Sequence, residues 1–177
     1  MLRRTMAVVI HTERTILREF VEDDVSAFFT LGNHPEIVRF TADPGGGFRN
    51  LEHARDMLIS HPIADYAKYG FGRLAVVHRE DDRVIGFCGL KYLEEFGEPD
   101  LGYRLHPDYW GQGLATETAR AAMNWGFEKL ELDRIMALVL PANTASIRVL
   151  EKLGMKLTDT IDYSGESAYR YVIHRST

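Results

Sequence analysis

The spacing of apolar residues along the chain separates it into strands and helices. Short apolar runs bounded by turn residues predict strands at 14–20, 74–77, 84–87, 100–105, 135–140 and 169–173. Apolar residues three and four positions apart predict helices at about 23–31, 50–58, 113–130 and 143–153. Antiparallel hairpins come first and a strand–helix–strand segment follows, an order that indicates a mixed α+β fold.

Turn and cap residues mark where several of these elements begin and end. Asp23 or Asp24 can cap the first helix and Asn50 the second, because their side-chain oxygens accept hydrogen bonds from free backbone N–H groups. Gly154 suits the left-handed conformation that closes the last helix. The acidic turn at 80–82 predicts one hairpin and the turn at 96–99 predicts a second.

Composition narrows the class of protein. The 177 residues, 45% hydrophobic and 27% charged, fit a single domain over residues 1–177. A net charge of −5 argues against a nucleic-acid or anionic-membrane partner, and no apolar stretch approaches the roughly 20 residues of a membrane span. The single cysteine, Cys88, lies in an apolar run as a core residue, and a chain without disulfides is typical of the cytoplasm. The histidines form no ligand motif, so we expect no metal site.

The most informative segment joins a predicted strand to the long predicted helix, over residues 106–117. Pro107 ends the strand, and Gly111 and Gly113 let the backbone turn tightly and approach a ligand. The helix that follows starts with N–H groups that have no intrahelical acceptor, at the positive end of the helix dipole. Such a start suits a phosphate or pyrophosphate. A glycine turn that only joins strand to helix also fits, whereas a Walker-type loop and the dinucleotide glycine fingerprint do not.

This segment resembles the acetyl-CoA loop of the GNAT acetyltransferases, whose motif is Gln/Arg-x-x-Gly-x-Gly/Ala. Gly113 and Ala115 fill its last two positions, and Trp110 stands where Gln or Arg is usual. The form Trp-Gly-x-Gly-x-Ala is similar to the ribosomal-protein N-terminal acetyltransferases of the RimJ/RimL type. Residues 143–155 resemble the family's second motif, Asn-x-x-Ser/Ala…Glu-Lys-x-Gly-Phe, and residues 34–38 resemble the branch's N-terminal region.

The resemblance implies a GNAT fold: a mixed, mostly antiparallel sheet flanked by helices, with a bulged strand splayed to admit acetyl-CoA. The pantetheine arm would bond to the splayed strand as an added strand does, and the pyrophosphate to the loop. The implied cofactor-binding residues are Tyr103, Arg104, Leu105, Gln112, Gly113, Leu114, Ala115, Thr116, Asn143, Ser146 and Arg148. Several of these residues have an alternative role. The first three could simply pair with a neighbouring strand, Asn143 could cap its helix, and Arg148 could be solvated.

The chemistry that the resemblance implies is direct acetyl transfer to a primary amine. Many GNAT enzymes place a tyrosine as proton donor where this chain has Leu150, so Ser146 is the implied donor, unless its hydroxyl bonds to its own helix. An attacking amine must be neutral, and an α-amine with a reference pKa of about 7.7–8.0 needs only a weak base. Asp100 is the first candidate for that base and Glu98 the second, although either could be a carboxylate of a surface turn.

The acceptor is expected to be a protein N-terminal α-amine or a small-molecule amine. Its pocket would be formed by the first helices, the loop at 43–47 and an acidic hairpin carrying Glu94, Glu95, Glu98 and Asp100, whose charge suits a cation. A non-catalytic acyl-CoA-binding module and an unrelated phosphate-binding protein are the alternatives. Asn143, Ser146 and Asp100 favour the enzyme over the module, and the second motif disfavours the unrelated protein. A homodimer stays open.

Overall fold

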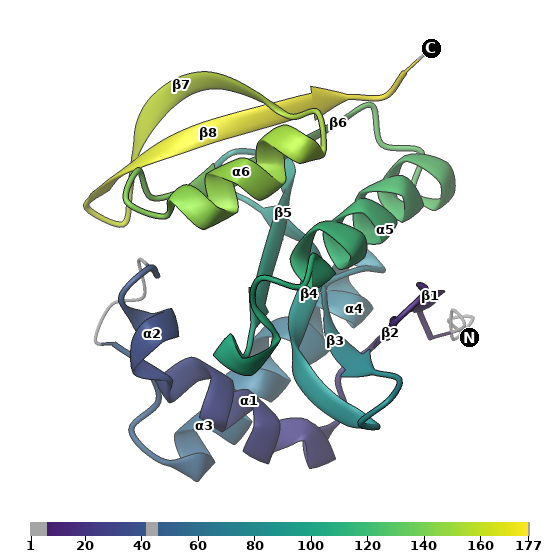
Figure 1. Cartoon of the computed structure of the whole chain (residues 1–177), viewed down its shortest axis with the longest axis vertical. Helices are drawn as coiled ribbons and strands as arrows, with labels where there is room; N and C mark the ends of the chain where they lie inside the picture. The colour runs from purple at the N-terminus through teal and green to yellow at the C-terminus, as the bar shows by residue number, and fades with distance from the viewer. Residues whose placement is uncertain (1–6, 42–45, 177) are drawn as a thin grey trace.

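The computed structural model describes residues 7–41 and 46–176 (Figure 1). Its strands are β1 (Val9–His11), β2 (Thr15–Arg18), β3 (Arg73–His78), β4 (Arg83–Leu93), β5 (Glu98–Leu105), β6 (Arg134–Val139), β7 (Lys156–Tyr163) and β8 (Glu166–His174). Its helices are α1 (Val25–Asn33), α2 (Pro35–Val38), α3 (Leu51–Leu58), α4 (Ala64–Tyr69), α5 (Leu114–Lys129) and α6 (Thr144–Lys152). The four predicted helices and both hairpins are therefore confirmed, but β4 extends six residues beyond its predicted end at 87, and α4 was not predicted.

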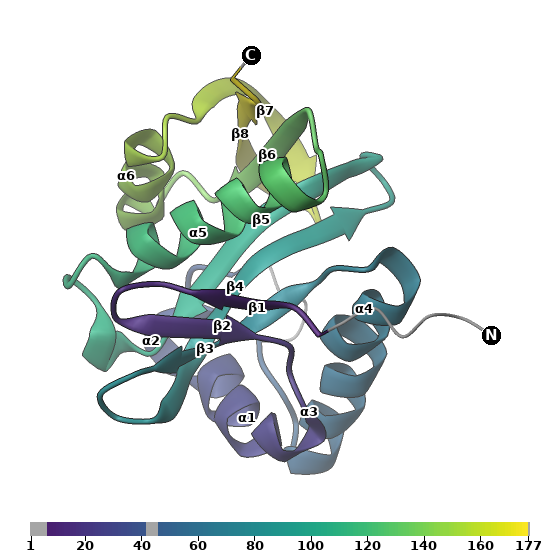
Figure 2. The ribbon, with the colours of Figure 1, turned by 90° about the vertical axis from the view of Figure 1, so that its right-hand side faces the viewer.

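The strands form one sheet in the order β1-β2-β3-β4-β5-β6-β8-β7. Every neighbouring pair is antiparallel except β5 and β6, which run parallel and share only the pair Asp100 and Met136 before they diverge. Helices α5 and α6 lie on one side of the sheet, and α1, α3 and α4 on the other (Figure 2). The mixed, mostly antiparallel GNAT architecture with a splayed strand is confirmed.

Two details of the expected sheet differ. The register of β5 on β4 is continuous, so the bulge expected in β5 is not seen in this pairing, and register shifts occur instead between β3 and β4 at Val76/Val77 and between β7 and β8 at Leu157/Asp159. Strands β1 and β7 were not predicted. Strand β7 alternates poorly because it is an outer strand whose side chains are largely exposed, and such a strand needs little apolar periodicity.

Helix caps follow the expected chemistry with one exception. The Asn50 side chain accepts from the backbone N–H of His53 at 2.8 Å, and Gly154 has a φ of 87° after α6. Asp24 precedes α1, but its carboxylate binds the Arg18 guanidinium at 2.7 Å instead of capping the helix. This ion pair ties α1 to the sheet.

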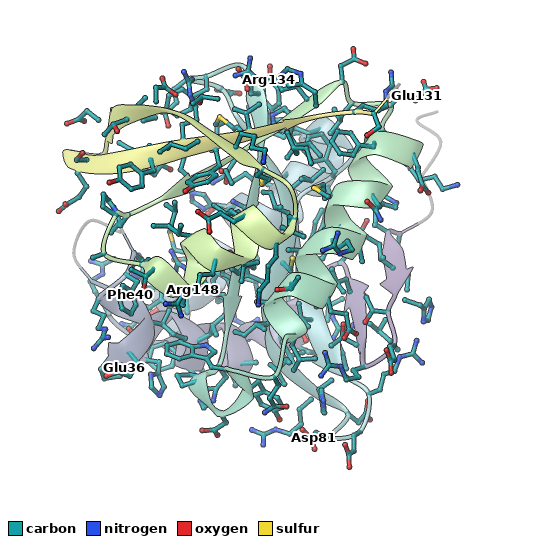
Figure 3. All side chains as sticks on the ribbon, turned by 45° about the horizontal axis from the view of Figure 1, so that its top comes forward. Glu36, Phe40, Asp81, Glu131, Arg134 and Arg148 are labelled. Atoms are coloured by element: carbon teal, nitrogen blue, oxygen red, sulfur yellow. The ribbon has the colours of Figure 1, made fainter. Side chains whose placement is uncertain are left out.

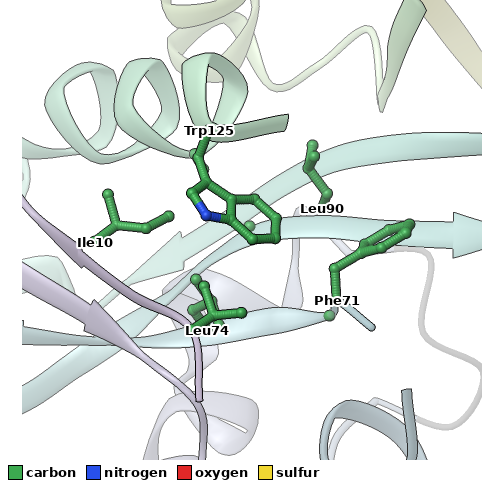
Figure 4. A pocket seen from close by; sticks show the side chains of 9 residues that line it. Ile10, Phe71, Leu74, Leu90 and Trp125 are labelled. Atoms are coloured by element: carbon green, nitrogen blue, oxygen red, sulfur yellow. The ribbon is translucent and has the colours of Figure 1, made fainter. Parts of the chain in front are cut away.

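The main core lies between the sheet and the helices α5 and α6. Cys88 is fully buried in it, as expected, and burial raises the pKa of its thiol to about 12. An apolar pocket under α5, lined among others by Ile10, Leu74 and Trp125, has no room for a water molecule (Figure 4). This pocket is part of the core and does not carry the chemistry.

Candidate active site

The candidate site begins where β5 and β6 part. Asp100, on β5, accepts a hydrogen bond from the backbone N–H of Leu138 at 3.2 Å. Its carboxylate is also ion-paired with Arg73, which donates to the carbonyl oxygens of Gly89 and Asp100 as well. Arg73 and Asp100 therefore join β3, β4, β5 and β6 at the point where the gap opens. Arg73 was missed in the sequence because nothing local marks its partner.

These contacts bear on the predicted role of Asp100 as general base. Its side chain is only 9% exposed, and burial raises its pKa while Arg73 opposes the rise. Glu98, the second candidate, is ion-paired with Arg134 at 3.1 Å near the β4–β5 turn. Both carboxylates are engaged in holding strands together, which argues against either as the base.

The loop after β5 is anchored to the end of that strand and exposed to solvent at its glycines. The Trp110 indole donates from Nε1 to the carbonyl oxygen of Leu105 at 2.7 Å, which closes the loop on the end of β5. Gly111 and Gly113 have φ values of 72° and 79°, a left-handed conformation that favours glycine, and residues 111–113 are exposed. Helix α5 then begins, and the N–H of Glu117 makes the first helical bond, to Gly113, at 3.0 Å.

The predicted pyrophosphate residues are thus together at one helix start. Gln112, Gly113, Leu114, Ala115 and Thr116 make up the last turn of the loop and the first turn of α5. The backbone N–H groups at such a start have no intrahelical acceptor and form an anion site. The structure also brings Arg14 to this turn, from a part of the chain that the sequence did not connect with it.

The other side of the gap is formed by α6. Asn143 caps this helix by accepting from the backbone N–H of Ser146 at 3.2 Å, as expected. Tyr103 reaches across from β5 and donates from Oη to the carbonyl oxygen of Ser146, also at 3.2 Å. Burial raises the pKa of Tyr103, so it stays neutral. Tyr103, Asn143 and Ser146 are therefore one connected group beside the gap.

The remaining predicted residues lie apart from that group. The side chain of Leu105 is buried in the core. The Arg104 guanidinium lies 5.5 Å from the centroid of the Phe87 ring. Arg148 lies on α6 and is exposed (Figure 3).

Most of the negative charge on the acidic hairpin is compensated by basic side chains. Glu94 is ion-paired with Lys68 and accepts from Tyr69, while Glu98 and Asp100 pair with arginines. Of the four carboxylates only Glu95 has no basic partner among the described residues. The charge argument for a cationic acceptor is weakened accordingly. The loop at 43–47 that was expected to complete the pocket lies largely outside the described residues.

Comparison with known proteins agrees with this geometry. The acetyltransferase (GNAT) domain family matches residues 14–156. The chain is 33% identical over 150 residues to the uncharacterized N-acetyltransferase p20 of Bacillus licheniformis, covering 83% of this chain and 82% of that protein. It is 38% identical over 146 residues to the spermidine N(1)-acetyltransferase of Escherichia coli K12, covering 80% and 72%. A solved structure of the ribosomal L7/L12 α-N-protein acetyltransferase RimL with coenzyme A superimposes with a TM-score of 0.81 at 18% identity, covering 94% and 98%.

The family match and the fold together define an acetyltransferase. The chain belongs to the GNAT family and is an N-acetyltransferase. Enzymes of this family use acetyl-CoA and an amine acceptor. At 18% identity the RimL structure shows the shared fold alone.

The described residues offer neither a metal site nor a membrane-spanning helix. Within residues 7–41 and 46–176, no group of three or more His, Cys, Asp or Glu side chains is placed to hold a metal ion. In the same part of the chain, no helix has the length and apolar character to cross a membrane.

Proposed function

We propose that this chain transfers an acetyl group from acetyl-CoA directly to a primary amine, with the pyrophosphate bound at residues 112–116. The observation that carries the proposal is the exposed glycine loop entering the start of α5 beside the gap between β5 and β6. Backbone N–H groups at that start suit the two phosphates. The residues present therefore fit the cosubstrate.

The gap supports a place for the pantetheine arm. Beyond Asp100 and Met136, the β5 edge that faces β6 has no strand partner among the described residues, and an extended arm can bond to it as an added strand does. Tyr103, Arg104 and Leu105 lie along that edge. The Leu105 carbonyl already accepts from Trp110, so we expect the arm to use the neighbouring backbone groups.

In the reaction, the amine nitrogen bonds to the thioester carbonyl carbon and the carbon–sulfur bond breaks. The proton that the amine loses balances the one that the thiolate gains. We propose the Ser146 hydroxyl as the donor to the sulfur, because Asn143 and Tyr103 hold the first turn of α6 beside the gap. An α-amine is partly neutral near its reference pKa of about 7.7–8.0 and needs only water as the base, whereas an alkyl amine, with a reference pKa of about 10.4 as in lysine, is mostly protonated at neutral pH and must first lose its proton to the solvent. As bases, Asp100 and Glu98 stay predictions that their ion pairs disfavour.

Two observations bear on the class of amine acceptor. Similarity to the spermidine N(1)-acetyltransferase, at 38% identity over 80% of this chain, supports a small polyamine. The RimJ/RimL-type motif of the loop supports a protein N-terminal α-amine instead. The higher identity lies with the first, and we propose a small-molecule primary amine as the acceptor.

A turnover screen tests both the acetyl transfer and the proposed class of acceptor. Purified protein with acetyl-CoA is offered spermidine, an N-terminal peptide, an aminoglycoside and free amino acids, and CoA thiol release is followed together with the product mass. We expect acetylated spermidine or another small amine. A peptide product alone would assign the protein N-terminal class. Tight CoA binding without turnover on any acceptor would support the non-catalytic module instead.

A further inference from the structure

The turn between β1 and β2 lies beside the start of α5 (Figure 2), and one guanidinium group joins the two. Arg14 donates from Nη1 to the carbonyl oxygen of Gln112 at 2.8 Å. It also donates from Nε at 2.8 Å to the Glu117 carboxylate, with Nη2 at 2.7 Å from the same oxygen. The second oxygen of Glu117 accepts from the Thr12 hydroxyl at 2.7 Å and from the Arg14 backbone N–H at 2.9 Å. Thr12, Arg14 and Glu117 thus form a latch on the loop.

The bond to Gln112 sets the direction of an N–H group. In a trans peptide, the carbonyl of residue 112 and the N–H of residue 113 point in opposite directions. Because Arg14 draws the Gln112 carbonyl toward itself, the Gly113 N–H is turned the other way. Gly113 has a φ of 79°, so its backbone is not confined to the common conformations and needs such a constraint.

The latch also removes an electrostatic conflict. A carboxylate in the first turn of α5 would repel a phosphate bound at the same helix start. Burial alone would raise the pKa of Glu117, but the hydrogen bonds from Thr12 and Arg14 outweigh it and the pKa lies below its ordinary value. Glu117 is therefore ionised, and its charge is compensated by Arg14 on the side away from the turned N–H.

We infer that Arg14 is a positioning residue for the cosubstrate: with Thr12 and Glu117, it fixes the 112–113 peptide so that the Gly113 N–H faces the pyrophosphate of acetyl-CoA. The inference rests on the proposed function, because it assumes that the loop binds that group. Arg14 acts through the backbone of the loop and needs no contact with the reacting atoms.

The test compares two arginines of the same hairpin. Arg14→Met removes the latch. Arg18→Met removes a similar forked pair, Arg18 with Asp24, whose side chains are 32% and 8% exposed against 41% and 18% for Arg14 and Glu117. Calorimetric Kd values for CoA, steady-state KM and kcat, and thermal melting are measured for both. We expect Arg14→Met to raise Kd and KM for the CoA substrate about tenfold with kcat nearly unchanged, and Arg18→Met to leave Kd within about twofold.

Arg14→Lys is the second variant and keeps the charge. An ammonium group lacks the planar fork that binds the Gln112 carbonyl and Glu117 together, so we expect about a fivefold loss of CoA affinity. A wild-type Kd in Arg14→Lys, or equal Kd values in Arg14→Met and Arg18→Met, would overturn the latch alone. Failure of the wild-type protein to bind CoA would overturn the proposed function, and the latch with it.

Discussion

The substitution Asp100→Asn separates a strand-holding role from a catalytic one. Arg73 and Asp100 are only 16% and 9% exposed, so removing one charge leaves the other buried and unpaired. Breaking such a pair costs about 3–5 kcal/mol. Asparagine keeps an oxygen for the Leu138 N–H, so we expect the low end, about 3 kcal/mol. For a chain of this size that corresponds to a drop in Tm of about 6–12 °C.

Urea unfolding monitored by circular dichroism measures the loss, and kcat is taken at a temperature where the variant stays folded. Glu98→Gln is the matched control on the same strand. Its ion pair with Arg134 is more exposed, at 23% and 38%, and should contribute under about 1 kcal/mol. If Asp100→Asn instead keeps wild-type stability and loses kcat by 100-fold or more, as expected for a general base at about 10²–10⁴-fold, the structural reasoning is refuted.

Three further predictions concern the loop, the donor and the thiol. Gly113→Val should abolish CoA binding in calorimetry because its φ of 79° disfavours a branched side chain, while Gly165→Val, with a φ of 80° in the β7–β8 turn, should bind CoA normally. Ser146→Ala should lower kcat by about 10²-fold, the low end of general acid catalysis, with KM for acetyl-CoA unchanged; a raised KM at wild-type kcat would make Ser146 a binding residue. Cys88, with a thiol pKa of about 12, should resist alkylation at pH 8 until the protein unfolds, and kcat should survive both Cys88→Ala and EDTA; rapid labelling of native protein would contradict this assignment.

Residues close together in the sequence were sufficient to predict the elements that form the candidate site. The loop at 106–113, the long helix after it and the capped helix α6 each depend on residues within a few positions of one another. Glycines specify the left-handed turns of the loop, Asn143 accepts from the free N–H of Ser146 at the start of α6, and Gly154 ends that helix. The cytoplasmic location, a homodimer and the identity of the general base stay predictions, because the spacing of neighbouring residues in the sequence does not determine any of them.

Only the tertiary structure decided which charged groups meet. Asp100 reads as an acidic turn residue, yet it lies next to Arg73 because β3, β4 and β5 pair side by side. Arg14 and Glu117 are 103 positions apart and meet because the β1–β2 turn folds against the start of α5. Strand β7 is ordered by pairing with β8 rather than by its own apolar pattern. Local patterns report a side chain's neighbours along the chain, whereas the partner of an ion pair depends on sheet register and helix packing, which sum contacts from the whole molecule.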